Sequence, residues 1–275
     1  MKLRKSWLPA HVLAWLYALL LLVPLYYLLV SAFKTNDQIF AAPFSLPTSL
    51  SPRNFGHAFT TAGLGSAIVS SALVTAVALL VTVVLAVPAA FAVARSEGAF
   101  GAAAERIFSL GFLVPTFAAL FPTFLLAAAT GLFHTRLFMT LFLPATALPL
   151  AVVILVQFMR TIPREMEEAA RLDGATTLAL LRHVYTPLCL PGIATVVLLN
   201  FLSFWNEYLY SLVIIGPAPH QRTVQVALPT LRALTGTDYG VLTAGTVLTL
   251  IPVWVVYTVL QKRMQQALVS GAVKM

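Results

Sequence analysis

Six uncharged, apolar stretches follow one another along the chain, and each is long enough to cross a lipid bilayer as a helix. They cover residues 12–33, 66–94, 107–133, 137–159, 192–216 and 241–260. A helix needs about 20 residues to cross the ~30 Å hydrocarbon core. Glu207 is the only charged residue inside any of them. The pattern predicts an all-α membrane protein with six transmembrane helices in a single domain over residues 1–275.

The composition narrows the class of protein further. Hydrophobic residues make up 60% of the 275 residues and charged residues only 9%, whereas soluble domains carry about 25% charged residues. This deficit excludes an ordinary soluble enzyme, a disordered chain and a DNA-binding protein, and it makes the lipid bilayer the main surroundings. The net charge is +8, but the sequence has no stripe of Lys and Arg residues of the kind that follows the phosphate backbone of a nucleic acid. No nucleic-acid partner is therefore expected. The single cysteine, Cys189, excludes an internal disulfide and a cysteine-based zinc site.

The Lys and Arg residues predict the orientation in the membrane. With the N-terminus inside, 12 of the 17 basic residues lie on the cytoplasmic side and 5 on the other side. Cytoplasmic loops carry an excess of Lys and Arg in membrane proteins. We therefore expect a multi-pass protein of the cytoplasmic membrane with both termini in the cytoplasm.

The loop at residues 160–191 breaks the apolar pattern. It holds 8 of the 26 charged residues (17 basic plus 9 acidic). Pro163 suits a first helical turn, the acids that follow complement a helix N-terminus, and Gly174 supplies a stop. A helix between them is too short to span a bilayer, so it is expected to lie along the membrane face and dock on a partner. Its weakly apolar face is expected to consist of Ile162, Met166, Ala169 and Ala170.

A second helix is expected in the same loop over residues 178–185. Thr176 or Thr177 can cap its N-terminus, because a threonine hydroxyl accepts a hydrogen bond from a free backbone N–H. Since a residue before proline disfavours helical geometry, the helix is expected to end before Pro187.

Three strings in the second half of the chain resemble a known family. The string Glu168-Ala169-Ala170-Arg171-Leu172-Asp173-Gly174-Ala175, followed by Pro187 and Pro191, resembles the EAA motif of ABC importer permeases. Its form is similar to the carbohydrate-uptake branch, whose six-helix subunits are called MalG-like. Trp205-Asn206-Glu207-Tyr208 and the C-terminal Gln261-Lys262-Arg263 and Ser270-Gly271-Ala272-Val273-Lys274 are similar to further elements of that branch. Two positions depart from it: Thr186 stands where the family usually has Leu, and Leu181 replaces a frequent Phe.

The resemblance implies a type I ABC importer permease that works by alternating access. Its cytoplasmic coupling helix would dock on an ATPase subunit through Glu168, Ala169, Ala170, Asp173, Gly174 and Ala175. The implied partners are a homologous second permease, two ATPase subunits and an extracytoplasmic substrate-binding protein, in the inner membrane of a prokaryote. This chain has no G-x-x-x-x-G-K-[ST] nucleotide-binding motif, so we expect that it does not hydrolyse ATP and is not an enzyme. We also expect it to bind no cofactor and no metal. ATP and Mg would bind to the partner ATPase subunits.

Four polar or aromatic residues around the intramembrane acid are candidates for the substrate path. They are Asn206, Glu207, Tyr208 and Tyr210. A charged group in lipid usually faces a cavity or a partner, and amide, carboxylate and aromatic groups suit a sugar. The alternative is that Glu207 forms a hydrogen bond between helices. In the C-terminal tail, Gly271, Ala272, Val273 and Lys274 would reach the ATPase by resemblance, or the basic residues would simply hold the last helix at the headgroups.

The sequence leaves alternatives open for the transported substrate, for the energy source and for the class of protein. The leading interpretation is an importer of a mono- or oligosaccharide, and a glycerol phosphate ester or a polyol would use the same mechanism. An ion-coupled secondary transporter would need a proton relay, for which only Glu207 is available in the membrane. An intramembrane enzyme would need clustered catalytic residues, and no HExxH, paired Asp or Ser–His set occurs at membrane depth.

Overall fold

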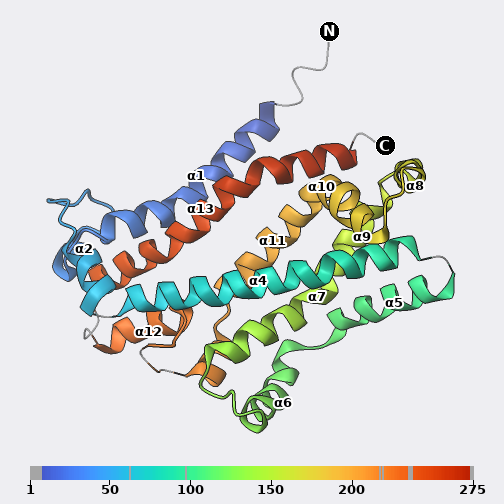
Figure 1. The fold of residues 1–275 in the computed structure, drawn as a ribbon. Coiled ribbons are helices and arrows are strands. Elements are labelled where there is room, and N and C mark those ends of the chain that lie inside the picture. Colours follow the sequence, from blue (N-terminus) through green and yellow to red (C-terminus); the bar gives the residue numbers. More distant parts are fainter. Residues whose placement is uncertain are drawn as a thin grey trace. The chain divides into compact units, whose positions relative to one another are not determined.

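The computed structural model describes residues 8–61, 63–96, 98–216, 218, 220–234 and 238–272. This part of the chain is helical and contains no strand. The longer helices are α1 (Leu8–Ser31), α4 (Leu64–Arg95), α5 (Ala99–Leu110), α6 (Thr116–Ala129), α7 (Arg136–Arg160), α11 (Leu190–Trp205), α12 (Val224–Leu234) and α13 (Tyr239–Ala272) (Figure 1). The shorter ones are α2 (Asn36–Ala41), α3 (Arg53–Gly56), α8 (Arg164–Leu172), α9 (Thr177–Leu180) and α10 (Thr186–Leu188). Wider π turns form η1 (His57–Thr61), η3 (Leu181–Tyr185) and η4 (Ser211–Ile215), and η2 (Gly111–Leu113) is a 3₁₀ turn.

Four helices are long and apolar enough to span a membrane within the described ranges. They are α1, α4, α7 and the Tyr239–Lys262 part of α13, and they coincide with the predicted stretches at 12–33, 66–94, 137–159 and 241–260. A fifth span is possible if Thr177–Leu188 and Leu190–Trp205, which meet at an angle of 74°, count as one. The predicted total of six spans is therefore not confirmed.

The third predicted stretch, residues 107–133, is not one helix. Helix α5 starts earlier, at Ala99, and ends at Leu110; η2 follows, and α6 begins only at Thr116. Val114 and Pro115 between them have extended backbone, with ψ of 111° and 121°. A residue before proline is driven away from helical geometry, which explains the interruption.

The fifth predicted stretch, residues 192–216, is also interrupted. Helix α11 begins at Leu190 and ends at Trp205, and the helical chain resumes only after Tyr208, leading into η4. Apolar composition alone predicted a continuous helix here. The interruption falls at the charged Glu207, whose hydrogen bonds are described below.

The chain forms two compact units, and the prediction of a single domain over 1–275 stays a prediction. The first unit comprises Met1–Ser66 and Ala227–Ile251, and the second comprises Ala67–Val226 and Pro252–Met275. In the first unit, the buried Lys34 donates from Nζ to the carbonyls of Ala42 (2.9 Å) and Pro43 (3.2 Å) and to Ser45 Oγ (3.2 Å). A buried ammonium is tolerated only when its donors are satisfied in this way.

The second unit contains two apolar cores along helix α7. One core joins α4, α7, α9, η3 and α11, and includes Phe91, Leu155 and Tyr185. The other joins α4, α6, α7, the end of α11 and η4, and includes Phe138 and Ile214. Helices α5 and α11 both pack against α7 (Figure 1). The charged loop takes part in the first core, because Ile162, Leu180 and Tyr185 belong to the core and Ala170 of α8 packs against it.

Candidate functional site

Helix α8 forms where local signals in the sequence placed it. Pro163 precedes it with φ of −58°, and Glu165 and Glu167 occupy its first turn, where acids complement the helix dipole. At its end, Gly174 adopts φ of +83° and donates its N–H to the carbonyl of Arg171 (3.0 Å). The N–H of Ala175 reaches back to the carbonyl of Ala170 (2.9 Å). This pair of bonds is a Schellman motif, which confirms the predicted helix stop at Gly174.

The second helix of the loop is longer than expected. Thr176 caps it, because its Oγ1 accepts from the N–H of Ala179 (3.3 Å). The prediction that it ends before Pro187 is wrong, since the helical segment continues through η3 and α10 to Leu188. The π turn η3 widens the backbone just ahead of Pro187, where a proline ring would otherwise crowd the preceding turn. The side chain of Thr186 also bonds across this wider turn, because its Oγ1 donates to the carbonyl of Leu181 (2.7 Å).

The surface of α8 is divided between an exposed part and a packed part. Of the predicted apolar face, Ile162 is buried and Ala170 packs against the first core, whereas Met166 (44% exposed) and Ala169 face outward. Leu172 adds an apolar side chain that is 90% exposed. Of the six candidates for partner contact, the exposed ones are Glu168, Ala169, Asp173 and Gly174, and the half-buried ones are Ala170 and Ala175.

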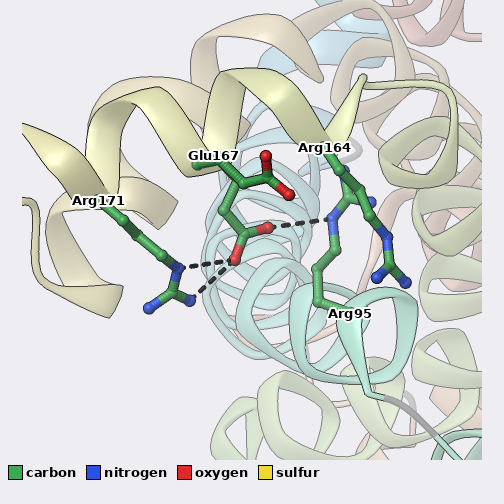
Figure 2. A pocket seen from close by; sticks show the side chains of 5 residues that line it. Arg95, Arg164, Glu167 and Arg171 are labelled. Carbon is green, nitrogen blue, oxygen red and sulfur yellow. Dashed lines mark hydrogen bonds and ion pairs between the residues drawn. The ribbon is translucent and has the colours of Figure 1, made fainter.

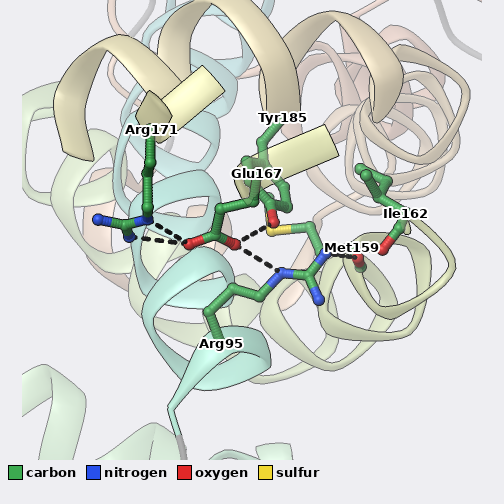
Figure 3. A network of polar contacts seen from close by, with 6 residues as sticks. All are labelled: Arg95, Met159, Ile162, Glu167, Arg171 and Tyr185. Carbon is green, nitrogen blue, oxygen red and sulfur yellow. Dashed lines mark hydrogen bonds and ion pairs between the residues drawn. The ribbon is translucent and has the colours of Figure 1, made fainter. Parts of the chain in front are cut away.

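Glu167 turns inward from α8 and is the centre of a polar network (Figure 3). Its Oε2 accepts from the hydroxyl of Tyr185 at 2.6 Å and lies 3.5 Å from Nε of Arg95. Its Oε1 accepts from Nε and Nη2 of Arg171, at 3.1 and 2.8 Å. Burial alone raises the pKa of the Glu167 carboxyl, but the hydrogen bonds from Tyr185 and Arg171 and the charges of Arg171 and Arg95 outweigh it. The net pKa is therefore below the ordinary value of 4.5.

Arg95, the last residue of α4, connects this network to three other elements. Its Nη2 donates to the carbonyl of Met159 (3.2 Å), near the end of α7, and to the carbonyl of Ile162 (2.8 Å). Its guanidinium lies 4.9 Å from the ring centroid of Tyr185 in η3, a cation–π geometry. The side chain of Arg95 is only 12% exposed. One guanidinium thus contacts α7, the segment leading to α8, α8 itself and η3.

A small open pocket of about 140 Å³ adjoins the network. Its lining consists of Arg95, Arg164, Glu167, Glu168 and Arg171. Figure 2 shows Arg95 and Arg171 reaching Glu167 from opposite sides. Charged side chains of both signs suit contact with polar groups of another protein. The described residues include no cluster of three or more His, Cys, Asp or Glu side chains that could hold a metal ion.

The substrate-path candidates surround the break after α11. The carboxylate of Glu207 accepts from the backbone N–H of Tyr210 (2.7 Å), the N–H of Ser211 (2.8 Å) and the hydroxyl of Ser211 (2.6 Å). These bonds start the next helical segment, as an N-cap does, which accounts for the interrupted helix. Tyr210 is buried and donates its hydroxyl to the carbonyl of Thr116 (2.6 Å).

The other two candidates remain more accessible. Asn206 is exposed, donates from Nδ2 to the carbonyl of Leu202 (2.8 Å) and accepts from Nε2 of Gln225 (3.1 Å). Tyr208 is 42% exposed. The bonds of Glu207 lie within its own turn, and both the substrate path and the alternative of a hydrogen bond between helices stay predictions.

The tail candidates fall at the edge of what the structure describes. Gly271 and Ala272 end the backbone of α13, and Val273 and Lys274 lie outside the described residues. Their contact with an ATPase stays a prediction.

Sequence reasoning missed Arg95, Glu167 and Tyr185 as parts of the site. Arg95 entered only the count of basic residues, and Glu167 entered only as a helix-start acid. Arg95 and Glu167 are 72 positions apart in the sequence (167 minus 95), and no short motif joins them. The available signal was weak: Arg95 ends an apolar stretch, and Glu167 precedes the EAA string.

Comparisons with known proteins agree with the geometry. The family model described as binding-protein-dependent transport system inner membrane component matches residues 83–270. The diacetylchitobiose uptake system permease protein NgcG of Streptomyces coelicolor is 32% identical over 263 residues, which cover 95% of this chain and 87% of that protein. The melibiose/raffinose/stachyose import permease protein MelC of Bacillus subtilis is 26% identical, with 92% of this chain and 91% of that protein covered.

A solved structure has the same fold. It is a chain from the crystal structure of a bacterial ABC transporter involved in the import of the acidic polysaccharide alginate. The TM-score is 0.81 at 24% identity, and the match covers 94% of this chain and 96% of that chain. The network around Glu167 lies entirely within the residues matched by the family model.

Proposed function

The chain belongs to the family of inner-membrane components of binding-protein-dependent transport systems, and on that premise we propose that it is the permease subunit of an ATP-driven carbohydrate importer. It is a multi-pass membrane protein with several apolar helices. The observation that carries the proposal is helix α8, a short helix with a Schellman stop whose outer face is exposed and whose inner face is fixed by Glu167. A rigid, exposed helix too short to span a bilayer is suited to receive force from another subunit.

The substrate class follows from the relatives. Diacetylchitobiose, melibiose, raffinose, stachyose and alginate appear in the names of the similar proteins, and all are saccharides. A mono- or oligosaccharide is therefore the proposed cargo. A glycerol phosphate ester or a polyol is the second candidate, and the ligand that thermally stabilises the cognate substrate-binding protein distinguishes the two.

The proposed assembly contains this chain, a homologous second permease, two ATPase subunits and an extracytoplasmic substrate-binding protein. ATP and Mg bind to the ATPase subunits, and this chain supplies no catalytic residue. The excess of Lys and Arg on the side of α8 supports a cytoplasmic location for α8 and for both termini. Closure of the ATPase pair would move the docked helices and switch the permeases between inward- and outward-facing states.

Gly174 allows a direct test of the docking proposal. A Cβ added at Gly174 would meet nothing within 4 Å, so the tip of the loop has room for a larger residue. Asn and Asp are similar in size and tolerate a positive φ better than most residues, but only Asp adds a second carboxylate beside Asp173. We expect Gly174→Asp to insert and assemble with the ATPase subunits yet to lose most uptake per ATP hydrolysed. The control Gly174→Asn should keep most of it.

The measurement is saccharide uptake and ATP hydrolysis by the complete transporter in proteoliposomes. Unimpaired uptake by Gly174→Asp would contradict the docking role. Inhibitors separate the energy sources: vanadate, which blocks ATPases of this kind, should abolish uptake, whereas a protonophore should not. Inhibition by the protonophore alone would instead support an ion-coupled transporter.

A further inference from the structure

We propose that Arg95 and Glu167 form a clamp that positions the coupling helix α8 on the membrane bundle and transmits its movement to α4. Tyr185, which contacts both residues, completes the group, and the three residues together are called the clamp below. The inference rests on the proposed function, because it assigns a role in coupling to residues outside the EAA string. These are positioning residues, which touch neither ATP nor the cargo.

The first argument is the convergence of elements on Arg95. Its guanidinium bonds the carbonyls of Met159 and Ile162, pairs with Glu167 and lies over the ring of Tyr185. Arginine presents five donors in a rigid plane. Because all of these contacts are made by one planar group, a displacement of the guanidinium changes them together. Because Arg95 is the last residue of α4, any displacement of α8 acts on the end of a 32-residue helix.

The second argument is the direction of Glu167. The other two acids of α8, Glu165 and Glu168, are exposed, whereas the side chain of Glu167 is only 15% exposed. Its Oε2 faces inward to Arg95 and Tyr185, while its Oε1 is held by Arg171 on the same helix (Figure 3). The bonds from Arg171 to Oε1 hold the side chain of Glu167 in one rotamer, in which Oε2 faces Arg95 and Tyr185.

The third argument is that η3 is tied to the same helix end. The ring of Tyr185 meets the ring of Phe91 edge-on, with centroids 4.7 Å apart, in addition to its contacts with Arg95 and Glu167. Tyr185 is fully buried. The helices on both sides of the Gly174 turn are therefore fixed to the last turns of α4, and the loop should move as one body with α4.

The principal test measures saccharide uptake per ATP hydrolysed by the complete transporter in proteoliposomes. We expect Arg95→Gln and Glu167→Gln each to lower this ratio about tenfold, within the range typical of coupling between sites. Glu165→Gln is the matched control, because it removes the same charge from an exposed position on the same helix, and it should leave the ratio unchanged. A residue that only supports folding would lower the yield of transporter and leave the ratio per assembled complex intact.

The double variant Arg95→Gln/Glu167→Gln should lower the ratio by less than the product of the two single losses, because both changes break the shared Arg95–Glu167 pair. An unchanged ratio in the single variants, or losses that multiply in the double variant, would overturn the clamp. If Arg95→Gln does not accumulate in the membrane, Tyr185→Phe decides the question. It removes the hydroxyl that donates to Glu167 and keeps the ring beside Phe91 and Arg95, and it should lower the ratio to a smaller extent.

A second readout does not depend on transport. A spin label placed by Leu172→Cys, in a Cys189→Ala background, reports the mobility of α8 in the full-length chain in lipid nanodiscs, since Leu172 is 90% exposed. Glu167→Gln should make the label more mobile, and Glu165→Gln should not. Equal mobility in both variants would overturn the clamp even if uptake falls. Absence of ATP-dependent saccharide uptake by the unmodified transporter would overturn the proposed function instead, and the label would still decide the clamp.

Discussion

The carboxylate of Glu207 allows a quantitative test of whether a charge within an apolar stretch serves the fold or the cargo. It accepts three hydrogen bonds, at 2.7 and 2.8 Å from the backbone N–H groups of Tyr210 and Ser211 and at 2.6 Å from the Ser211 hydroxyl. Glu207→Gln keeps one oxygen and turns an NH₂ group toward a backbone donor. One bond to a charged acceptor is then lost, which should cost about 2 kcal/mol of folding free energy.

Removing the whole group should cost more. Glu207→Ala leaves all three donors without this acceptor, and because such bonds are not additive we expect a loss of about 4 kcal/mol. Tyr208→Phe is the control, because its side chain is 42% exposed and lies in the same turn, and it should leave the stability unchanged.

Cys189 supplies the assay. It is the only cysteine in the chain and is 1% exposed, so a thiol-reactive fluorescent dye reports unfolding of the detergent-solubilised protein. At about 2–4 °C per kcal/mol for a chain of this size, Glu207→Gln should lower the Tm by several degrees and Glu207→Ala by about twice as much. The KM for uptake should not change in Glu207→Gln. An unchanged Tm together with a raised KM would refute this reasoning and show that the carboxylate binds the cargo.

Two further predictions concern the network and the first unit. Because the pKa of Glu167 is lowered, its ionised form stabilises the fold above its ordinary pKa of 4.5, and this stabilisation is lost as the pH falls through the lowered pKa. The Tm difference between the parent and Glu167→Gln should therefore be constant near neutral pH and shrink below about pH 4.5; a difference that persists or grows there contradicts the assignment. A Cβ on Gly240 would overlap the carbonyl oxygen of Lys34, so Gly240→Ala should cost about 2 kcal/mol in the same thermal assay. Gly56→Ala, where a Cβ meets nothing within 4 Å, should be neutral, and equal effects at the two glycines would contradict the close packing.

The sequence predicted elements whose cause is local. Helix α8 and its stop depend on Pro163, the first-turn acids and Gly174, all within 12 consecutive residues, and each acts on the backbone next to it. Four of the six apolar stretches likewise became long helices, because a continuous apolar run needs no information from elsewhere in the chain. The breaks at Pro115 and Glu207 were harder to predict, since proline and one carboxylate also occur inside continuous membrane helices.

The clamp could not be predicted for a different reason. Arg95 makes hydrogen bonds to residues 64 and 67 positions away, and its acceptors are backbone carbonyls, which carry no side-chain signal in a sequence. Glu167, Glu165 and Glu168 are chemically equivalent in the sequence. In the structure, Glu167 is the acid that contacts Arg95 and Tyr185, and nothing in the sequence distinguishes it from the other two.

The angle of 74° between the Thr177–Leu188 segment and α11 has a mechanical consequence. The two segments form an elbow at Cys189, and the angle is close to a right angle. A push along the axis of the first segment therefore reaches α11 mainly as a sideways force, with little component along the axis of α11. If the loop that carries α8 is displaced along the axis of the Thr177–Leu188 segment, α11 would tilt and would move little along its own axis.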